Sequence, residues 1–428
     1  ARRGVPQSRQ IHILLAAGHR DLERIVPGFD AALEGAGAPE FDAIGHWHAH
    51  SQFGWFPVRP SEIKTRLATR GLVEHVVRQS VLAHANVTLL ERTRIAAIPF
   101  ADGAAQGFMV RSADTDRGEE RLLPADLVVD ASGRQSRLPQ ALEASGCGAT
   151  AETVIDARIG YACRWYNPPP GRTFPWRFLL IRNPRLMQRV CGIALMENGQ
   201  WLVNLAGYGG DYPPNDVAGF EAFLASIGCD EVARALKDAE PVSDIAGYRD
   251  TVNRWRHFER LAAWPDRLLA VGDAVCAFNP VYGQGMSAAA REAQMLASTL
   301  GQGTDLRMAG ACRRLQKDLA RFLAGPWTLA TGEDYRFATT LGPPRPRLMR
   351  LAHWFTDRVM QAATTDSYVQ DRFMRVMHMV DAPLALANPL VVARALLSPR
   401  AAPSIDGGGR VVDGPPAYQH GRSMAAPP

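Results

Sequence analysis

The stretch Asp266–Leu300 constrains the fold more than any other part of the sequence. Leu268–Val271 is a short apolar run of the length expected for a buried parallel strand, and the carboxylate of Asp273 comes after it, separated by one glycine. Small and apolar residues recur at helical spacing from Met286 onward. Between strand and helix lies a turn-rich loop with Asn279, Pro280, Gly283 and Gly285. This order predicts an α/β fold with a ligand at the strand's carboxyl end, beside unpaired N–H groups of the helix.

The same stretch resembles the second flavin motif of FAD-dependent monooxygenases of the aromatic-hydroxylase type, a family that also includes squalene-epoxidase-like enzymes. The resemblance implies that Asp273 hydrogen-bonds the ribityl chain of FAD and that Pro280 lies beside the flavin ring. It also implies that the loop Gly283–Met286 faces the N1/O2 edge of that ring. The cofactor-binding residues assigned here are Gly272, Asp273, Pro280, Gly283, Gln284, Gly285 and Met286. The alternative is an ordinary strand, loop and helix with a glycine-rich turn.

A second strand-to-loop junction lies at Leu123–Val129, followed by Asp130 and the sequence ASGRQSR. It resembles the middle motif of the same family, which contacts the FAD pyrophosphate near Asp130 and Gly133 and has been linked to NAD(P)H. The family arginine matches Arg137, which here directly follows a serine, and Arg134 is an additional cation. This departure leaves the nicotinamide role open.

The N-terminal part of the sequence lacks the G-x-G-x-x-G turn that opens a dinucleotide-binding fold. The segment Arg3–Ala38 resembles the region after the second strand in a bacterial subgroup of the family, so we expect the first βαβ unit to be missing from this chain. Glu62–Ala85 has helical periodicity, and Arg70 matches the family arginine that reaches the FAD phosphates. His12 is a candidate for the flavin and substrate pocket, although a lone histidine is more often structural.

The region between the two motifs predicts an antiparallel sheet, because short alternating runs are separated by turn residues. In the family such an inserted sheet forms the floor of the substrate site. The candidate substrate-binding aromatics are Tyr161, Trp176, Phe178 and Trp201, with core packing as the alternative for each. His46, His48 and His50 alternate as in a half-exposed strand, and we expect no metal site there.

Composition excludes several classes of protein. Six scattered cysteines form no C-x-x-C pair, which argues against a disulfide scaffold or zinc site and favours a cytoplasmic protein. The net charge of +5 arises from 48 basic and 43 acidic residues that are mixed along the chain, so we expect no nucleic-acid partner. The sequence contains no apolar run long enough to span a membrane.

The C-terminal region Arg347–Leu397 predicts amphipathic helices with several methionines. Met-rich faces adapt to irregular hydrophobic ligands or to a membrane surface, so peripheral membrane contact is one possibility and core packing is the other. The Gly-, Pro- and Ala-rich tail after Pro399 predicts disorder.

The sequence thus predicts a Rossmann-like α/β domain with an inserted antiparallel sheet and C-terminal helices. The expected parts are 1–146 and 261–325 for FAD binding, 147–260 for substrate, 326–398 as a helical region and 399–428 as a disordered tail. The resemblance implies a hydroxylase or epoxidase that uses NAD(P)H and O₂. Its reduced FAD takes up O₂ at carbon C4a and passes one oxygen to a small apolar organic substrate. No catalytic acid or base is singled out.

Three alternatives remain. A flavin-dependent halogenase is disfavoured because the W-x-W-x-I-P segment is absent. A flavin-dependent reductase of prenyl chains would turn over without consuming O₂. A truncated or cofactor-free, non-enzymatic relative would be colourless.

Overall fold

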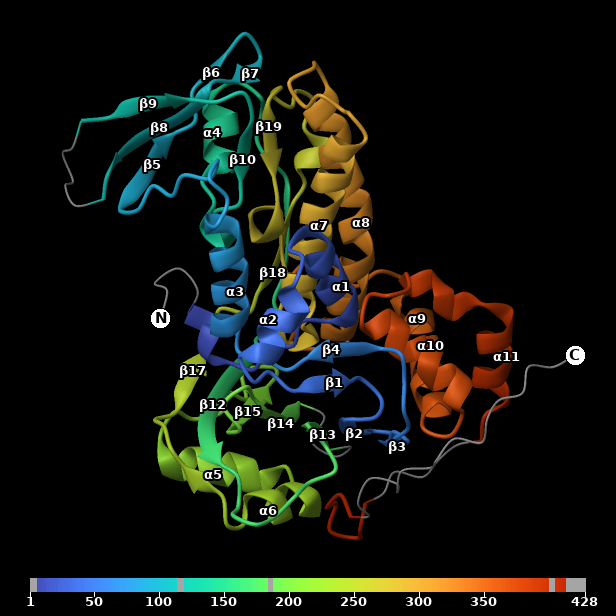
Figure 1. Ribbon diagram of the computed structural model, residues 1–428. Coiled ribbons are helices and arrows are strands. Elements are labelled where there is room, and N and C mark those ends of the chain that lie inside the picture. The colour runs from blue at the N-terminus through green and yellow to red at the C-terminus, as the bar shows by residue number, and fades with distance from the viewer. Residues whose placement is uncertain (1–5, 114–118, 184–187, 400–404, 413–428) are drawn as a thin grey trace, which may run out of the picture.

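The computed structural model describes residues 6–113, 119–183, 188–399 and 405–412. Figure 1 shows a mixed α/β molecule in which helices α7 and α8 stand beside strands β10 and β19. A large sheet lies below them with helices α5 and α6 on its far side, and helices α9, α10 and α11 form a separate lobe.

The helices are α1 (Ala16–Ile25), α2 (Phe29–Gly35), α3 (Arg70–Leu82), α4 (Leu138–Ala144), α5 (Val217–Ser226), α6 (Asp230–Leu236), α7 (Gln284–Gly301), α8 (Ala311–Asp334), α9 (Met349–Ala363), α10 (Ser367–Met377) and α11 (Pro389–Leu397). The short 3-10 turns are η1 (Pro6–Arg9), η2 (Gly133–Gln135), η3 (Phe258–Arg260), η4 (Gly272–Ala274), η5 (Pro280–Tyr282) and η6 (Pro383–Ala387). The strands are β1 (Glu40–Asp42), β2 (Trp47–Ser51), β3 (Gly54–Trp55), β4 (Lys64–Arg66), β5 (Thr93–Ala97), β6 (Phe100–Ala101), β7 (Ala104–Ala105), β8 (Gly107–Ser112), β9 (Arg121–Pro124), β10 (Val128–Asp130), β11 (Glu152–Ile155), β12 (Gly160–Asn167), β13 (Phe178–Arg182), β14 (Arg189–Leu195), β15 (Trp201–Gly207), β16 (Glu240–Pro241), β17 (Ala246–Tyr248), β18 (Asn253–Arg256), β19 (Leu268–Ala270) and β20 (Cys276–Ala277).

The two predicted strand-to-loop junctions lie side by side. Strands β10 and β19 pair in parallel, with Val128 opposite Leu268 and Asp130 opposite Ala270. All three residues of β19 are buried, and they share an apolar core with α4, α7 and α8. Because parallel strands end at the same edge of a sheet, the loops that come after Asp130 and Ala270 emerge together.

The region between the motifs contains the expected antiparallel sheet, formed by β12, β15, β14 and β13. Strand β2, from much earlier in the chain, extends this sheet by pairing in parallel with β13. His48 and His50 lie on β2 as predicted, but both are buried, so the expectation of a half-exposed strand is wrong. The described residues contain no group of three His, Cys, Asp or Glu side chains placed to hold a metal ion.

Several predicted boundaries differ from the structure. The helix expected over Glu62–Ala85 begins only at Arg70, because Lys64–Arg66 pairs with β1 as strand β4. Thr69 caps the helix by accepting a hydrogen bond from the N–H of Leu72 over 3.1 Å.

The C-terminal helices form as predicted, but their methionines do not make an exposed face. Met374 is buried in the core between α9, α10 and the N-terminal segment, and Met360 and Met377 pack against that core. None of the helices within the described ranges is long and apolar enough to cross a membrane.

The tail after Pro399 is not wholly disordered as predicted. Among residues 405–412, the Val411 side chain is buried, and Arg410 forms an ion pair of 2.6 Å with Asp230 on α6. The remaining positions of the predicted tail, 400–404 and 413–428, lie outside the described residues.

Candidate functional site

The Gly272–Asp273 turn opens the candidate site at the end of β19. Gly272 adopts a left-handed backbone with φ of 62°, a region that favours glycine. Its N–H donates a 2.8 Å hydrogen bond to Oε2 of Glu292, a buried residue on α7. The turn presents the side chain of Asp273, which keeps 33% of its surface exposed. A carboxylate is therefore available to a ligand in front of β19.

Three cations surround this carboxylate. Burial raises the pKa of Asp273, and the positive charges of Arg134, Arg70 and Arg256 oppose that rise. Arg134 Nε lies 3.8 Å from Asp273 Oδ2. The structure thus brings Arg70, from the start of α3, into the same electrostatic environment as Asp273, more than 200 positions away in sequence.

His12 belongs to this neighbourhood as well. The pKa of His12 is lowered to about 4, mainly by burial, while the carbonyl oxygen of Gln10 opposes this shift and the charge of Arg70 adds to it. The Nδ1 atom of His12 lies 2.9 Å from that carbonyl oxygen. His12 is consequently neutral near pH 7, which suits a pocket wall better than an anion-binding role.

The Asp130 carboxylate accepts hydrogen bonds from the loop that follows it. Its Oδ1 accepts hydrogen bonds from the N–H and the hydroxyl of Ser132, over 2.9 and 2.6 Å, and its Oδ2 accepts from the hydroxyl of Ser136. Gly133 lies in this loop with φ of 84°, and no atom occupies the space where a Cβ would stand. The loop therefore offers backbone to a ligand, whereas the Asp130 carboxylate is engaged internally.

Two largely buried arginines, whose roles were not predicted, join the motifs. Arg134 donates to the carbonyl oxygens of Val252 and Phe278 over 2.7 and 2.6 Å. Arg256 donates to the carbonyl oxygens of Ala274 and Arg134 over 2.9 and 2.7 Å. The loops after β10 and β19 are thereby held at a fixed spacing.

Helix α7 begins at the edge of the same site. Gly283 caps the helix with φ of 64°, and the first N–H groups of α7, from Gln284 to Met286, have no carbonyl within the helix to bond. A Cβ placed on Gly285 would lie 4.0 Å from Asp273 Oδ1 and would meet nothing nearer. The Met286 side chain packs against the core formed by α1, α2 and α3.

The site contains buried polar atoms that have no hydrogen-bond partner among the described residues. They include Nε of Arg70, Nε of Arg134 and Oε1 of Gln284. Unpaired buried donors beside a helix N-terminus match a ligand that is anionic or rich in acceptors. The residues present fit the ribityl chain and ring edge of a flavin.

The candidate substrate aromatics lie on two faces of the large sheet. Tyr161 and Phe178 face the side that carries the motif loops, and the Tyr161 hydroxyl donates to Asn279 Oδ1 over 3.1 Å. Trp176 and Trp201 lie in the core beneath α5 and α6, where Trp176 donates to Glu231 over 3.0 Å. The structure does not bring these two tryptophans to the flavin motifs.

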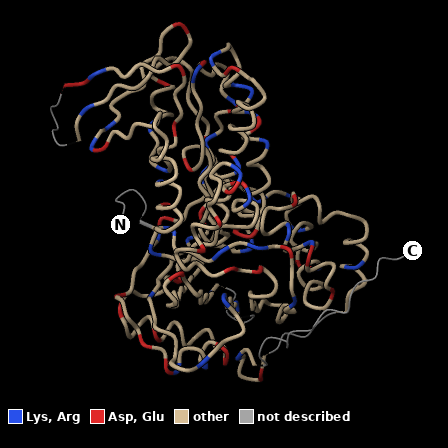
Figure 2. Tube along the Cα trace, viewed as in Figure 1, with Lys and Arg blue, Asp and Glu red and all other residues tan. Residues whose placement is uncertain are grey.

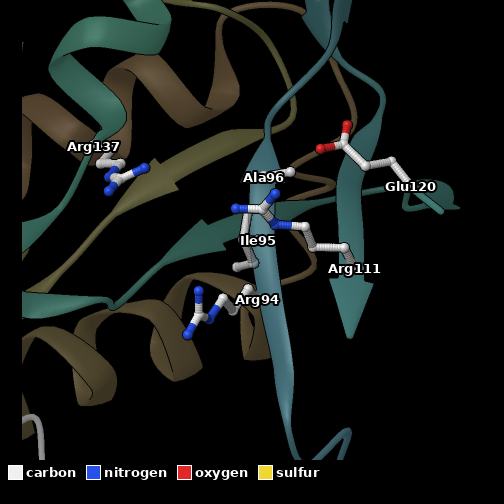
Figure 3. A pocket seen from close by; sticks show the side chains of 6 residues that line it. All are labelled: Arg94, Ile95, Ala96, Arg111, Glu120 and Arg137. Carbon is white, nitrogen blue, oxygen red and sulfur yellow. The ribbon is translucent and has the colours of Figure 1, made fainter. Parts of the chain in front are cut away.

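A separate hollow of about 450 Å³ lies on the β5–β8–β9 sheet. Figure 3 shows Arg94 and Arg137 pointing into it from opposite sides, with Arg111 and Glu120 nearby. Its walls are exposed and charged, and it shares only Arg137 with the predicted motifs. Arg137 therefore lines this hollow, and the charges that act on the Asp273 carboxylate are those of Arg134, Arg70 and Arg256.

Known proteins resemble this chain in sequence and in fold. No family model matches the sequence. Protein Rv3254 of Mycobacterium tuberculosis (strain ATCC 25618 / H37Rv) is 27% identical over 401 residues, which cover 92% of this chain and 84% of that protein.

Solved structures match over most of the chain. The flavin-dependent brominase Bmp2 superposes with a TM-score of 0.62 at 13% identity, over 91% of this chain and 88% of the brominase. The myxobacterial chondrochloren halogenase CndH gives 0.56 at 16% identity, over 92% of this chain and 90% of the halogenase. The chain has the fold of flavin-dependent halogenases and hydroxylases. Among the hydroxylases, OxyS anhydrotetracycline hydroxylase from Streptomyces rimosus gives 0.54 at 13% identity, over 87% and 68% of the two chains.

Proposed function

We propose that this protein is an FAD-dependent monooxygenase that uses NAD(P)H and O₂ to hydroxylate or epoxidise a small apolar organic molecule. The observation that carries the proposal is the parallel pairing of β10 and β19, with which the Gly133 loop and the N-terminal part of α7 both lie against the Asp273 turn. The Nε atoms of Arg70 and Arg134 are buried and have no hydrogen-bond partner among the described residues, and an acceptor-rich ligand would supply one.

Each group has a defined task in this proposal. Asp273 would hold the ribityl hydroxyls, the N–H groups of Gln284–Met286 would stabilise negative charge at the ring edge, and Arg70 would bind phosphate oxygens. When bound and reduced, the flavin supplies the oxygen-activating chemistry. The protein orients the apolar substrate and excludes water, and the neutral side chains of His12, Tyr161 and Phe178 suit that role.

A flavin-dependent halogenase is the second candidate, because a brominase and a halogenase share this fold over about nine-tenths of the chain. The dependence of the product on bromide distinguishes a halogenase from a monooxygenase. With FAD, NADPH and ¹⁸O₂, a monooxygenase gives product labelled with ¹⁸O whether or not bromide is present. A halogenase gives a brominated product only with bromide, and a reductase gives a hydrogenated product without O₂.

The substrates to test first are hydrophobic polyketide-like and isoprenoid-like compounds, with NADH compared against NADPH. Substrate-dependent O₂ consumption with ¹⁸O incorporation would support the proposal. Reduction of FAD with no oxygenated product from any of these compounds would contradict it.

We also propose that helix α9 makes peripheral contact with an anionic membrane surface. Leu348, Leu351 and Trp354 are 76%, 60% and 50% exposed on this lobe. Arg347 and Arg350 lie among them, and residues 341–356 include no Asp or Glu. Exposed Leu and Trp side chains beside arginines are typical of segments that bind at the interface of acidic lipids.

A further inference from the structure

A chain of buried polar side chains lies behind the loop that carries Pro280. Asn253 begins strand β18 and Asp334 ends helix α8, and both are fully buried. The Nδ2 atom of Asn253 donates to Asp334 Oδ2 over 2.5 Å, and Asn253 Oδ1 accepts the N–H of Asn279 over 2.6 Å. The start of the loop is therefore tied to two distant elements.

The rest of the loop is held by the same chain. Asn279 Oδ1 accepts the N–H of Val281 and the hydroxyl of Tyr161, both over 3.1 Å. The Tyr282 hydroxyl donates to Asp334 Oδ1 over 2.9 Å. Residues on each side of Pro280 are thus bonded to β12, β18 and α8. Such a network is expected to fix one loop conformation, because each buried group would otherwise lose a hydrogen bond.

We infer that Asp334 is a positioning residue, which through Asn253 and Tyr282 sets the placement of Pro280 and of the start of α7. The significance of that placement rests on the proposed function, since Pro280 would lie beside the flavin. Asp334 is fully buried and therefore does not itself contact a ligand.

The Asp334 carboxyl group is the shared acceptor of this chain, because one of its oxygens accepts from Asn253 and the other from Tyr282. An amide at this position would turn an N–H group toward one of these two partners. Burial raises the pKa of Asp334 to about 7, with Glu333 adding to the rise and the bonds from Tyr282 and Asn253 opposing it.

The other groups near Asp334 do not change charge near neutrality. Burial raises the pKa values of the surrounding tyrosines, which are Tyr161, Tyr208, Tyr282 and Tyr335. Arg182 donates a hydrogen bond to Tyr208 over 3.2 Å, and the pKa of Arg182 is raised despite its burial. Because the folded pKa of Asp334 is raised, its ionisation as the pH passes about 7 lowers the stability of the folded state and does not tighten the loop.

Hydrogen exchange on the flavin-free protein tests the inference. Asp334→Asn keeps the shape of the side chain but turns an N–H group toward one of its two partners, so one hydrogen bond is lost. The amides of Asn279 and of residues 281–283 should then exchange about tenfold faster than in the wild type at pH 7, after correction for intrinsic exchange. Tyr282→Phe removes a single bond and should also loosen the loop.

Asp42→Asn is the matched control, because it makes the same chemical change in another buried turn and should leave residues 279–283 unaffected. Equal exchange of the loop in wild type and Asp334→Asn would overturn the inference. Unchanged exchange in Tyr282→Phe would overturn it too.

Titration of the same proteins with FAD gives a separate outcome. A shifted flavin absorption band in Asp334→Asn supports the positioning role, and an unshifted band overturns the link to the flavin. If wild-type protein binds no FAD, the proposed function fails, and the exchange experiment still decides whether Asp334 orders the loop.

Discussion

Glu292→Gln should make the free energy of unfolding less dependent on pH. Glu292 lies on α7 with 1% of its surface exposed, and its Oε2 accepts the N–H of Gly272. Burial raises the pKa of Glu292 from 4.5 to about 7, the bond from Gly272 opposes the rise, and the charge of Asp273 adds to it. Folding therefore favours the protonated form.

The sign and size of the effect are set by this pKa. Because the folded pKa is raised, the stability that Glu292 contributes is fully present below pH 4.5 and is lost as the pH rises to about 7. The gap between these values corresponds to about 3 kcal/mol. Glutamine keeps the acceptor for Gly272 and does not titrate.

Urea unfolding of the flavin-free protein checks the prediction. The stability of Glu292→Gln relative to wild type should increase by about 2–3 kcal/mol between pH 5 and pH 8. A difference that stays constant across this range would refute the reasoning, because it would mean that Glu292 has an ordinary pKa in the folded protein.

Three further predictions concern other parts of the molecule. Asp273→Ala should weaken FAD binding by roughly 10–100-fold, because a charge-assisted hydrogen bond is lost. Quenching of flavin fluorescence measures the affinity, and equal affinity in the variant and the wild type would show that Asp273 does not bind FAD. Asp42→Ala should lower the free energy of unfolding by at least about 2 kcal/mol, because the Asp42 carboxylate accepts four hydrogen bonds in a buried turn. An unchanged midpoint of urea unfolding would contradict this prediction. The double variant Leu351→Gln, Trp354→Gln should reduce co-sedimentation with phosphatidylserine vesicles, whereas Leu300→Gln, a half-exposed leucine on α7, should not. Equal sedimentation of the three proteins would exclude α9 as the membrane face.

The order of strand, turn, loop and helix around Asp273 was predictable because its signals are local. The apolar run Leu268–Val271, the glycine at 272 and the small residues after Gly283 lie within about one supersecondary unit. The structure agrees closely, with β19 ending at Ala270 and α7 beginning two residues before Met286.

The connections between the motifs were not predictable. Arg256 bonds main-chain carbonyl oxygens of residues 134 and 274, and such acceptors exist at every position of a chain. No residue pattern marks which carbonyl a buried arginine will reach. The same holds for Asp334, whose partners Asn253 and Tyr282 are 81 and 52 positions away.

Alternation along a strand shows which side chains share a face, but it does not show what that face meets. Phe178 and Trp201 were equivalent candidates in the sequence. Helices α5 and α6 cover the face of Trp201, whereas Phe178 faces the N-terminal segment and α10. Likewise, the sequence shows that the C-terminal helices contain methionines, but whether these side chains are buried depends on how α9, α10 and α11 pack.

Charge also did not identify the site. Figure 2 shows acidic and basic residues spread over the whole trace, so no single patch indicates an anionic ligand. The cations that indicate the site are the partly buried Arg70 and Arg134. Only the three-dimensional structure shows that their Nε atoms have no hydrogen-bond partner among the described residues.

The most direct test of the flavin assignment is an FAD titration of the wild type, Gly285→Val and Gly301→Val, with the visible absorption spectrum as the readout. Both glycines lie on α7 with room for a Cβ, so both variants should fold, but only position 285 borders Asp273. We predict that the wild type and Gly301→Val bind FAD and turn yellow, and that Gly285→Val does not. Equal binding by all three proteins would place FAD elsewhere, and no binding by the wild type would contradict the flavin assignment itself.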